Sequence, residues 1–303
     1  MRVIHNIKDA GCIGPSVAAI GVFDGVHRAH SAIIKAAISK ARRLGVPAVV
    51  VTFWPHPRGQ ESLYSLEHRL RLLEDLGVDL CIVVRFTRMF ARMSPEAFVR
   101  DIICRCLNAR AVYVGENFRF GKNASGDVTD LSMLLMQCGA AGAAVKVFKT
   151  LKAGGKAISS SYIRRLISLG KLAAAQRLLL RPVAVYGHVV HGTGRGALLG
   201  FPTANIDPHH EITPPSGIYA VRVLLNSATL NGICYIGTRP TFYRGHNAFA
   251  IEVHIFNFNK NIYNKYIEVQ FIKKIRNDKS FASASELILQ IKRDISKTKK
   301  ILL

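Results

Sequence analysis

The stretch that decides the fold is Gly21-Val22-Phe23-Asp24-Gly25-Val26-His27-Arg28-Ala29-His30, which connects an apolar run to a helical pattern. Residues 17–22 predict a buried strand, Asp24-Gly25 a turn, and residues 29–44 a helix with apolar side chains at helical spacing. His27 and His30 then share one face of the first helical turn. Unpaired N–H groups and the helix dipole favour an anion there, so the stretch predicts a phosphate site.

Up to about residue 182, short apolar runs alternate with longer helical patterns. The sequence predicts strands at 46–53, 80–86, 111–114 and 144–148, and helices at 66–76, 95–107 and 128–138. This alternation is typical of a parallel sheet flanked by helices. It predicts an α/β domain with a doubly wound parallel sheet over residues 1–182.

After residue 182 the pattern changes to alternating runs rich in Val, Ile, Tyr and Phe. Strands are predicted at 183–190, 217–225, 232–236, 250–258 and 266–271, with Gly- and Asn-containing turns between them. Five or six such strands in about 90 residues predict a small antiparallel β-barrel domain over residues 183–303. An amphipathic C-terminal helix is expected at 284–295, followed by a frayed tail.

Composition narrows the class of protein. The chain has 303 residues, 49% of them hydrophobic, and a formal net charge of +23, which is enough length and apolar content for two domains. The basic residues are scattered singly, so we expect no nucleic-acid partner. No signal peptide or membrane span is expected. The six cysteines form no C-x-x-C pair, which favours reduced thiols in a cytoplasmic protein.

Three further segments of the first half place polar side chains beside a strand end or a helix start. Pro55-His56-Pro57-Arg58 follows one predicted strand and the 114–121 stretch follows another, where open α/β folds bind ligands. The serines at 159–161 open a helix and place Arg164 in its first turns, which suits a polyphosphate. Each segment alone is explained by a turn or a helix cap. The four segments together favour a ligand site.

With their spacing, these segments resemble the H-x-G-H nucleotidyltransferases, which transfer a nucleotide from a nucleoside triphosphate to a phosphate-bearing acceptor. The resemblance implies that His27 and His30 stabilise the transition state. A phosphate acceptor is already an anionic nucleophile, so this chemistry requires alignment and charge neutralisation rather than a strong base. The chain has Ala29 where the motif has glycine, and the added methyl could weaken nucleotide binding.

The second half contains a glycine loop at 192–196, followed by Gly200-Phe201-Pro202-Thr203-Ala204-Asn205. A flexible glycine loop before a hydroxyl and an amide predicts a phosphate flap beside a Mg²⁺ site. Farther on, Glu252 lies on the same side of a predicted strand as His254, and a carboxylate there is a candidate general base. A hairpin loop and a solvent-facing glutamate are the alternative interpretations.

G-F-P-T-A-N at 200–205, P-S-G-I-Y-A at 215–220, the 236–242 run and E-V-H at 252–254 resemble the riboflavin kinase module. In this chain the module directly follows the half that resembles a nucleotidyltransferase. The prokaryotic bifunctional riboflavin kinase/FAD synthetases have the same order. The resemblance implies that the second half phosphorylates riboflavin to FMN with ATP. It also implies that the first half adenylylates FMN to FAD and releases pyrophosphate.

The resemblance assigns roles to individual residues. Glu252 takes a proton from the terminal ribityl hydroxyl, because a hydroxyl requires a base. Asp278 stands where the family's flavin-side segment usually has glutamate. The other implied roles are nucleotide binding by Phe23, Asp24, Gly25, Ser160, Arg164, Gly192 and Gly200, flavin binding by His56, Asn117 and Arg276, and Mg²⁺ binding by Thr203 and Asn205.

The sequence leaves two alternative functions open. The first half could serve another phosphorylated acceptor, such as a pantetheine or nicotinamide nucleotide, but the kinase half argues against this, because its own product is an acceptor. A basic nucleic-acid-binding protein would carry interleaved aromatic and arginine side chains on exposed strands, and the predicted strands carry few. We therefore expect the small molecules ATP, riboflavin and FMN as substrates. The oligomeric state is left open.

Overall fold

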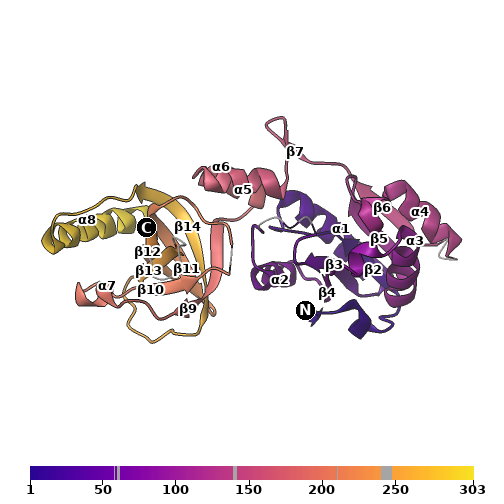
Figure 1. Ribbon diagram of the computed structural model, residues 1–303, viewed down its shortest axis with the longest axis horizontal. Coiled ribbons are helices and arrows are strands. Elements are labelled where there is room, and N and C mark those ends of the chain that lie inside the picture. Colours follow the sequence, from indigo (N-terminus) through magenta and orange to yellow (C-terminus); the bar gives the residue numbers. More distant parts are fainter. Residues whose placement is uncertain (58, 60–61, 139–141, 210, 240–247) are drawn as a thin grey trace. The chain divides into compact units, whose positions relative to one another are not determined.

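The computed structural model describes residues 1–57, 59, 62–138, 142–209, 211–239 and 248–303 (Figure 1). It divides into two compact units, residues 1–62 with 66–160, and residues 63–65 with 161–303. In the second unit, Glu211 Oε1 accepts hydrogen bonds from the Ser65 backbone nitrogen at 2.9 Å and from its hydroxyl at 2.7 Å. The helices α5 (Ser160–Ser168) and α6 (Leu172–Leu179) precede residue 182, and a domain boundary there stays a prediction.

The first unit is built on a six-stranded parallel sheet in the order β1-β4-β3-β2-β5-β6. The direction of winding changes between β2 and β5, so the carboxyl ends of these strands flank the switch point where such sheets bind ligands. The doubly wound prediction is confirmed. The strands are β1 Arg2–Ile4, β2 Ser16–Ile20, β3 Ala48–Trp54, β4 Leu80–Arg85, β5 Ala109–Gly115 and β6 Ala144–Phe148.

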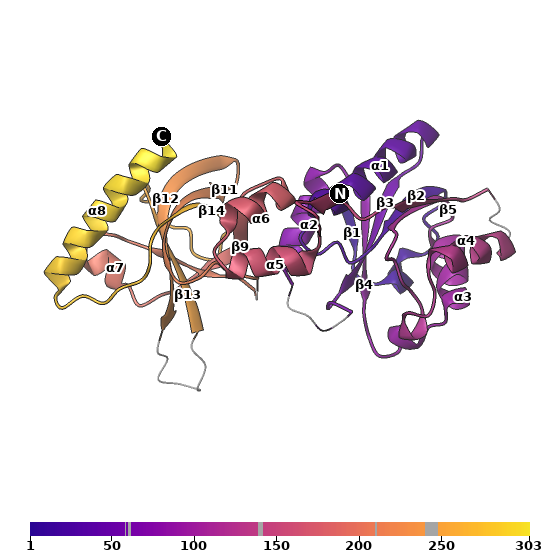
Figure 2. The same ribbon diagram turned by 90° about the horizontal axis from the view of Figure 1, so that it is seen from above.

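Helices cover both faces of this sheet (Figure 2). The central strand β2 is buried along its whole length, as a parallel strand covered on both faces requires. The helix predicted at 95–107 begins as α3 and continues as a π-helix, η3. The helices are α1 Arg28–Leu44, α2 Leu66–Asp75, α3 Pro95–Ala97, η3 Phe98–Cys106 and α4 Val128–Gln137. Three short helical turns are η1 Ile7–Ala10, η2 Phe90–Arg92 and η4 Lys122–Ala124. A small hairpin consists of β7 Lys152–Ala153 and β8 Lys156–Ala157.

The second unit contains a closed antiparallel barrel in the order β10-β13-β12-β11-β14-β9. Val185, Tyr219 and Val269, one from each of three strands, are fully buried, and interior side chains of this kind fill a small barrel. The short strand β10 has a mixed composition and was missed by sequence analysis. The elements are β9 Val183–Val190, α7 Arg195–Leu198, β10 Ala204–Asp207, β11 Gly217–Leu225, β12 Ala228–Arg239, β13 Ala248–Ile255 and β14 Tyr266–Arg276.

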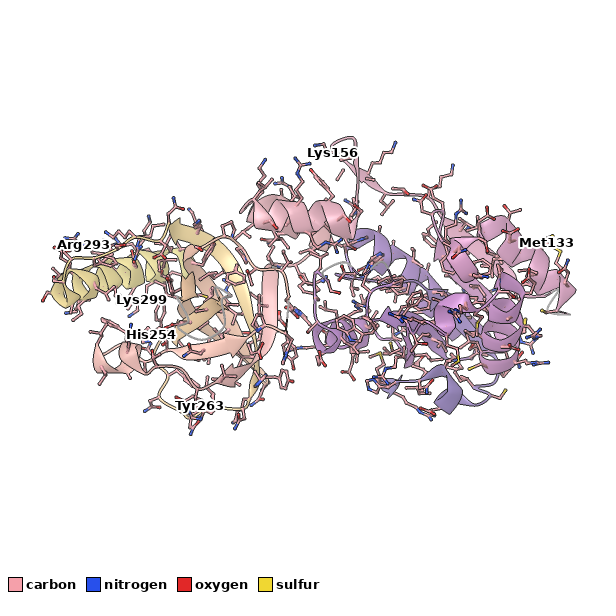
Figure 3. All side chains as sticks on the ribbon, viewed as in Figure 1. Met133, Lys156, His254, Tyr263, Arg293 and Lys299 are labelled. Atoms are coloured by element: carbon pink, nitrogen blue, oxygen red, sulfur yellow. The ribbon has the colours of Figure 1, made fainter. Side chains whose placement is uncertain are left out.

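The C-terminal helix is longer than predicted. Instead of ending near Ile295 in a frayed tail, α8 spans Ala284–Leu302. Its last turns are held because Thr298 and Leu302 are buried, the latter in a cluster with Phe256 of the barrel. Basic side chains such as Arg293 and Lys299 project from this helix (Figure 3). Among the described residues, none of the helices combines the length and hydrophobicity that a membrane span requires.

Candidate active sites

The loop between β2 and α1 is buried and sharply turned. Phe23, Asp24 and His27 are at most 3% exposed, and the Val26 nitrogen donates to the Phe23 carbonyl at 3.1 Å. Phe23, Gly25 and Val26 have φ angles of +49°, +81° and +37°. A left-handed conformation is costly for a β-branched residue and persists only where the surroundings hold it. The loop is therefore preformed by its packing.

The two histidines of this loop contact each other at the start of α1. His27 is the N-cap, and its Nδ1 accepts from the His30 nitrogen at 3.5 Å. The two imidazole rings stack with centroids 3.6 Å apart, and the Phe23 ring meets His30 edge-on at 5.3 Å. Because Nδ1 of His27 accepts, the proton of the neutral ring is on Nε2. The helix start thus adds imidazole donors to its own N–H groups.

A buried arginine that sequence analysis missed holds the loop to the sheet. Arg69 of α2 is fully buried, and its NH1 donates to the Val22 and Phe53 carbonyls at 3.0 and 3.2 Å. Its NH2 lies 3.8 Å from Asp24 Oδ1. Burial lowers the pKa of the guanidinium, and the Asp24 carboxylate raises it. A guanidinium stays charged throughout the physiological range, so Arg69 acts as a permanent cation beneath the loop.

The serine segment also reaches this loop. The Ser160 hydroxyl donates to the Asp24 carbonyl at 2.8 Å, so the start of α5 is tied to the turn beside the histidines. Arg164 belongs to the other compact unit, where its NH2 donates to the Ser161 hydroxyl at 3.0 Å. Ser160 is therefore placed at the predicted site, and the role of Arg164 stays a prediction.

The candidate flavin residues of the first unit follow the two strands that flank β2. His56 is half-buried after β3, and Asn117 is exposed after β5. The Asn117 amide donates to the Thr150 hydroxyl at 3.1 Å. Hydrogen bonds from Thr150 also lower the pKa of the neighbouring Glu116 carboxyl. Arg58, in the Pro-His-Pro segment, lies outside the described residues.

In the barrel, the candidate metal ligands meet the candidate base. The Thr203 hydroxyl donates to Glu252 Oε2 at 3.3 Å. Asn205 of β10 lies directly opposite Glu252 of β13 in the strand register. Nδ1 of His254, a residue labelled in Figure 3, contacts the Pro202 carbonyl at 2.8 Å and holds the turn before Thr203. A hydroxyl, an amide and a carboxylate are thus gathered on one part of the barrel.

The glycine loop wraps closely around these ligands. A Cβ atom on Gly192 would overlap the Asn205 side-chain amide, and one on Gly196 would lie 3.0 Å from Thr203 Oγ1. Gly200 has a φ of +85°, which favours glycine. The loop itself is largely exposed. Gly192 and Gly196 thus leave room for the two candidate ligands.

Arg276 forms an ion pair with the C-terminal helix. Its Nε donates to Asp294 Oδ2 of α8 at 2.8 Å, in an ion pair whose side chains are 19% and 6% exposed. Nearby, Asp278 accepts from the Tyr235 hydroxyl at 3.0 Å, and Tyr235 lies opposite Glu252 in the register. Arg276 therefore fastens the C-terminal helix, and a role in flavin binding stays a prediction.

Two protein-family models match the chain, one over each half. The model described as FAD synthetase matches residues 11–162, and the model described as riboflavin kinase matches residues 179–302. The chain belongs to the bifunctional riboflavin kinase/FMN adenylyltransferases. The interpretation of the sequence as an enzyme of this family is confirmed.

Individual relatives and a solved structure match this chain over nearly its whole length. The bifunctional riboflavin kinase/FMN adenylyltransferase of Escherichia coli strain K12 is 38% identical, over 97% of this chain and 95% of the relative. The enzyme of the same name from Bacillus subtilis strain 168 is 36% identical, over 96% and 93%. A solved structure described as a macrolide-efflux protein from Streptococcus pneumoniae superposes with a TM-score of 0.83 at 29% identity, over 98% of both chains.

The buried Arg69 carries a signal in the sequence itself. It lies in the apolar stripe of α2 together with the buried Leu66, Leu72 and Leu73. A charged residue at a core position is rarely buried unless it is paired, so the stripe pointed to an internal partner. The identity of that partner, the carbonyls of Val22 and Phe53, depends on the packing of α2 against the sheet.

Proposed function

We propose that this enzyme makes FAD from riboflavin in two steps, each with Mg²⁺ and ATP, and that the residues described above carry both steps. The observation that carries the proposal is the contact of Thr203 with Glu252 opposite Asn205 in one unit, together with the stacked His27 and His30 at a helix start in the other. Each unit holds the type of group that its reaction requires.

In the kinase step, Glu252 Oε2 accepts the proton of the terminal ribityl hydroxyl. The freed oxygen attacks the γ-phosphorus of ATP, the bond from that phosphorus to the bridging oxygen breaks, and ADP leaves. The Thr203 hydroxyl donates to the same carboxylate oxygen, so it holds the carboxylate in one orientation. Gly192 and Gly196, where a Cβ atom would crowd Asn205 and Thr203, are the proposed approach for the triphosphate.

The donor set of the barrel fits a hard divalent cation. Hydroxyl, amide and carboxylate oxygens are the ligands that Mg²⁺ prefers. Thr203 and Asn205 would hold the ion, and a bound Mg²⁺ would neutralise charge on the phosphates of ATP. The family relationship alone suggests only a divalent metal, and the choice of Mg²⁺ rests on these oxygen ligands.

In the adenylylation step, a phosphate oxygen of FMN attacks the α-phosphorus of ATP and pyrophosphate leaves. No strong base is required, so the site has to align the reactants and neutralise developing charge. The imidazoles of His27 and His30 and the first N–H groups of α1 supply donors at one place. Ser160 and Arg69 keep the loop backbone rigid through its carbonyls, and His56 and Asn117 are the proposed flavin contacts.

A product assay tests the proposal directly. Purified protein with riboflavin, ATP and Mg²⁺ should accumulate FMN and then FAD, which liquid chromatography separates by fluorescence. A chelator should stop both steps, and added Mg²⁺ should restore them. Absence of FMN would refute the kinase step, and FMN without FAD would refute the adenylylation step.

The partners are proposed to be these small molecules and no nucleic acid. Competing acceptors test the first part, because a pantetheine phosphate or a nicotinamide mononucleotide should give no adenylylated product under the same conditions. Binding to labelled single-stranded DNA tests the second part. An affinity that persists at physiological salt would contradict it, because non-specific binding through scattered charges falls steeply with salt.

A further inference from the structure

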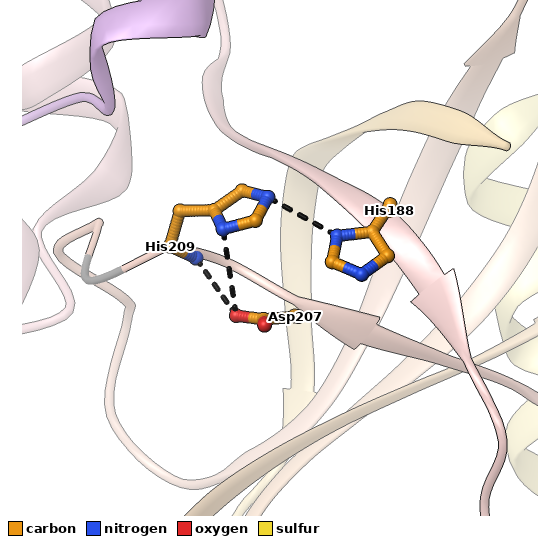
Figure 4. Close-up of side chains that lie close together, drawn as sticks. All are labelled: His188, Asp207 and His209. Carbon is orange, nitrogen blue, oxygen red and sulfur yellow. Dashed lines mark hydrogen bonds and ion pairs between the residues drawn. The ribbon is translucent and has the colours of Figure 1, made fainter. Parts of the chain in front are cut away.

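Away from the residues assigned above, the barrel carries a compact cluster of His188, Asp207 and His209 (Figure 4). His188 Nδ1 lies 3.1 Å from His209 Nε2. The other ring nitrogen of His209 lies 4.0 Å from Asp207 Oδ1. One ligand atom from each of the three residues lies within 4.8 Å of the others. Two imidazoles and a carboxylate are therefore close enough to share one cation.

The backbone brings these side chains together. The register pairs Asp207 of β10 directly with His188 of β9. The nitrogen of His209 donates to Asp207 Oδ1 at 3.0 Å, and His209 has a φ of +47°. This local turn returns the His209 ring over the strand pair. The arrangement is preset by a strand register and a turn, so little side-chain ordering is needed when an ion binds.

Aromatic packing fixes the orientation of both rings. The imidazoles of His188 and His209 stack with centroids 5.0 Å apart and planes 23° apart. Tyr266 of β14, the neighbour of His188 on the other side, contacts both rings at 5.6 and 5.9 Å. The side chains of His209 and Asp207 are 30% and 48% exposed. A cation from solution can therefore reach nitrogens whose directions are already set.

The spacing and the ligand types suit zinc better than magnesium. Two nitrogens bound to tetrahedral Zn²⁺ at 2.0–2.1 Å are about 3.3 Å apart, close to the separation of His188 Nδ1 and His209 Nε2. Imidazole suits Zn²⁺, whereas Mg²⁺ prefers oxygen ligands. Exposure of the cluster leaves room for water at the remaining coordination position.

We propose that His188, Asp207 and His209 form a Zn²⁺ site that is separate from the proposed Mg²⁺ site of the kinase. Asp207 follows Asn205 by two residues on β10, so the two side chains lie on the same face of the strand, about 7 Å apart along it. A bound ion would link β9 to the end of β10 and to the following turn. The proposal does not depend on the kinase assignment, because it rests only on the cluster.

Zinc binding by the whole chain tests the proposal. Metal-stripped protein is titrated with Zn²⁺ against a chromophoric chelator, with excess Mg²⁺ present to occupy oxygen sites. His188→Phe keeps an aromatic ring against Tyr266 but removes both nitrogens, and His209→Asn keeps a residue that tolerates positive φ. His5→Ala, which changes an exposed histidine of the first unit, is the matched control.

We expect the wild type and the His5→Ala variant to bind one more Zn²⁺ ion per chain than His188→Phe or His209→Asn. Asp207→Asn should lower the affinity for that additional Zn²⁺ ion at least tenfold. Co²⁺ in place of Zn²⁺ should give visible absorption bands that both histidine variants lose. Circular dichroism checks that each variant is folded, and either histidine variant alone is sufficient for the test. Equal Zn²⁺ stoichiometry and affinity in wild type and a folded histidine variant would overturn the proposal, because the two rings would then only hydrogen-bond to each other.

Discussion

The two glycine-containing loops at the proposed phosphate sites are built in opposite ways. The loop after β2 is buried, and Arg69 and Ser160 hold its backbone carbonyls. The loop after β9 is largely exposed, and Gly192 and Gly196 fit it around two side chains. The first loop is part of a protein core, and the second is an exposed loop that lies over the side chains of Thr203 and Asn205. Substitution of a residue that holds the first loop in place should therefore mainly affect stability, whereas substitution within the second loop should mainly affect catalysis.

The largest effect should come from the candidate base of the barrel. Glu252→Ala should lower riboflavin phosphorylation by about 10³-fold, because a positioned general base contributes 10²–10⁴-fold. Adenylylation of supplied FMN should remain. The two rates are measured separately, with riboflavin or FMN as the starting flavin. Loss of both activities in a folded variant would break the division of labour between the units.

The reciprocal substitution tests the first unit. His30→Ala should lower FMN adenylylation by about 10²–10³-fold, the usual cost of removing one donor to a charged transition state. Phosphorylation of riboflavin should be unchanged, so FMN should accumulate. Lys35→Ala on the exposed side of the same helix is the control and should leave both rates near those of the wild type. A His30→Ala enzyme that still makes FAD at the normal rate would remove His30 from the mechanism.

The buried cation of the first unit should mainly affect stability. Arg69→Met removes the cation that contacts Asp24 and the carbonyls of Val22 and Phe53, so the free energy of unfolding should fall by about 3 kcal/mol. Urea denaturation monitored at Trp54, which the Arg69 guanidinium overlies at 5.5 Å, reports on this unit. Arg43→Met at an exposed position of α1 should change stability by less than about 0.5 kcal/mol. Equal stabilities for the two variants would contradict the view of the first loop as part of the core.

The second loop should respond to a single methyl group. Gly192→Ala should lower kcat/KM for riboflavin phosphorylation by about tenfold or more. The added Cβ would displace the Asn205 amide, which we propose as a ligand of Mg²⁺. Gly194→Ala in the same loop meets no atom within 4 Å and adds only the strain of a φ of +71°, so it should cost less. A larger loss for Gly194→Ala would show that loop conformation matters more than the ligands.

The smallest effect concerns the motif position where this chain departs from its family. Ala29, the second residue of α1, has a methyl group at the proposed nucleotide site. Ala29→Gly should raise the adenylylation rate a few-fold at low ATP by lowering KM for ATP. Ala32→Gly, with the same helix cost, controls for lost helix stability. An unchanged KM would show that the methyl group does not reach the nucleotide.

Much of the geometry of the first candidate site was predictable because it is local. His27 and His30 are three residues apart, so a helix start alone brings them together. Arg69 reaches the same loop from α2, and only the packing of that helix on the sheet makes the contact. The tail of α8 was missed for a related reason, since Thr298 and Leu302 are buried by the barrel rather than by any pattern around them.

The sequence by itself determined the alternation of elements, the change from parallel to antiparallel structure near residue 182, and the motifs that place the chain in its family. These features repeat over a few residues, at the period of a strand or a helix. Only the tertiary structure decided which side chains meet across strands, as Asn205 meets Glu252 and Asp207 meets His188. A shift of one residue in register turns every side chain of a strand to its other face, and that register depends on the closure of the whole barrel.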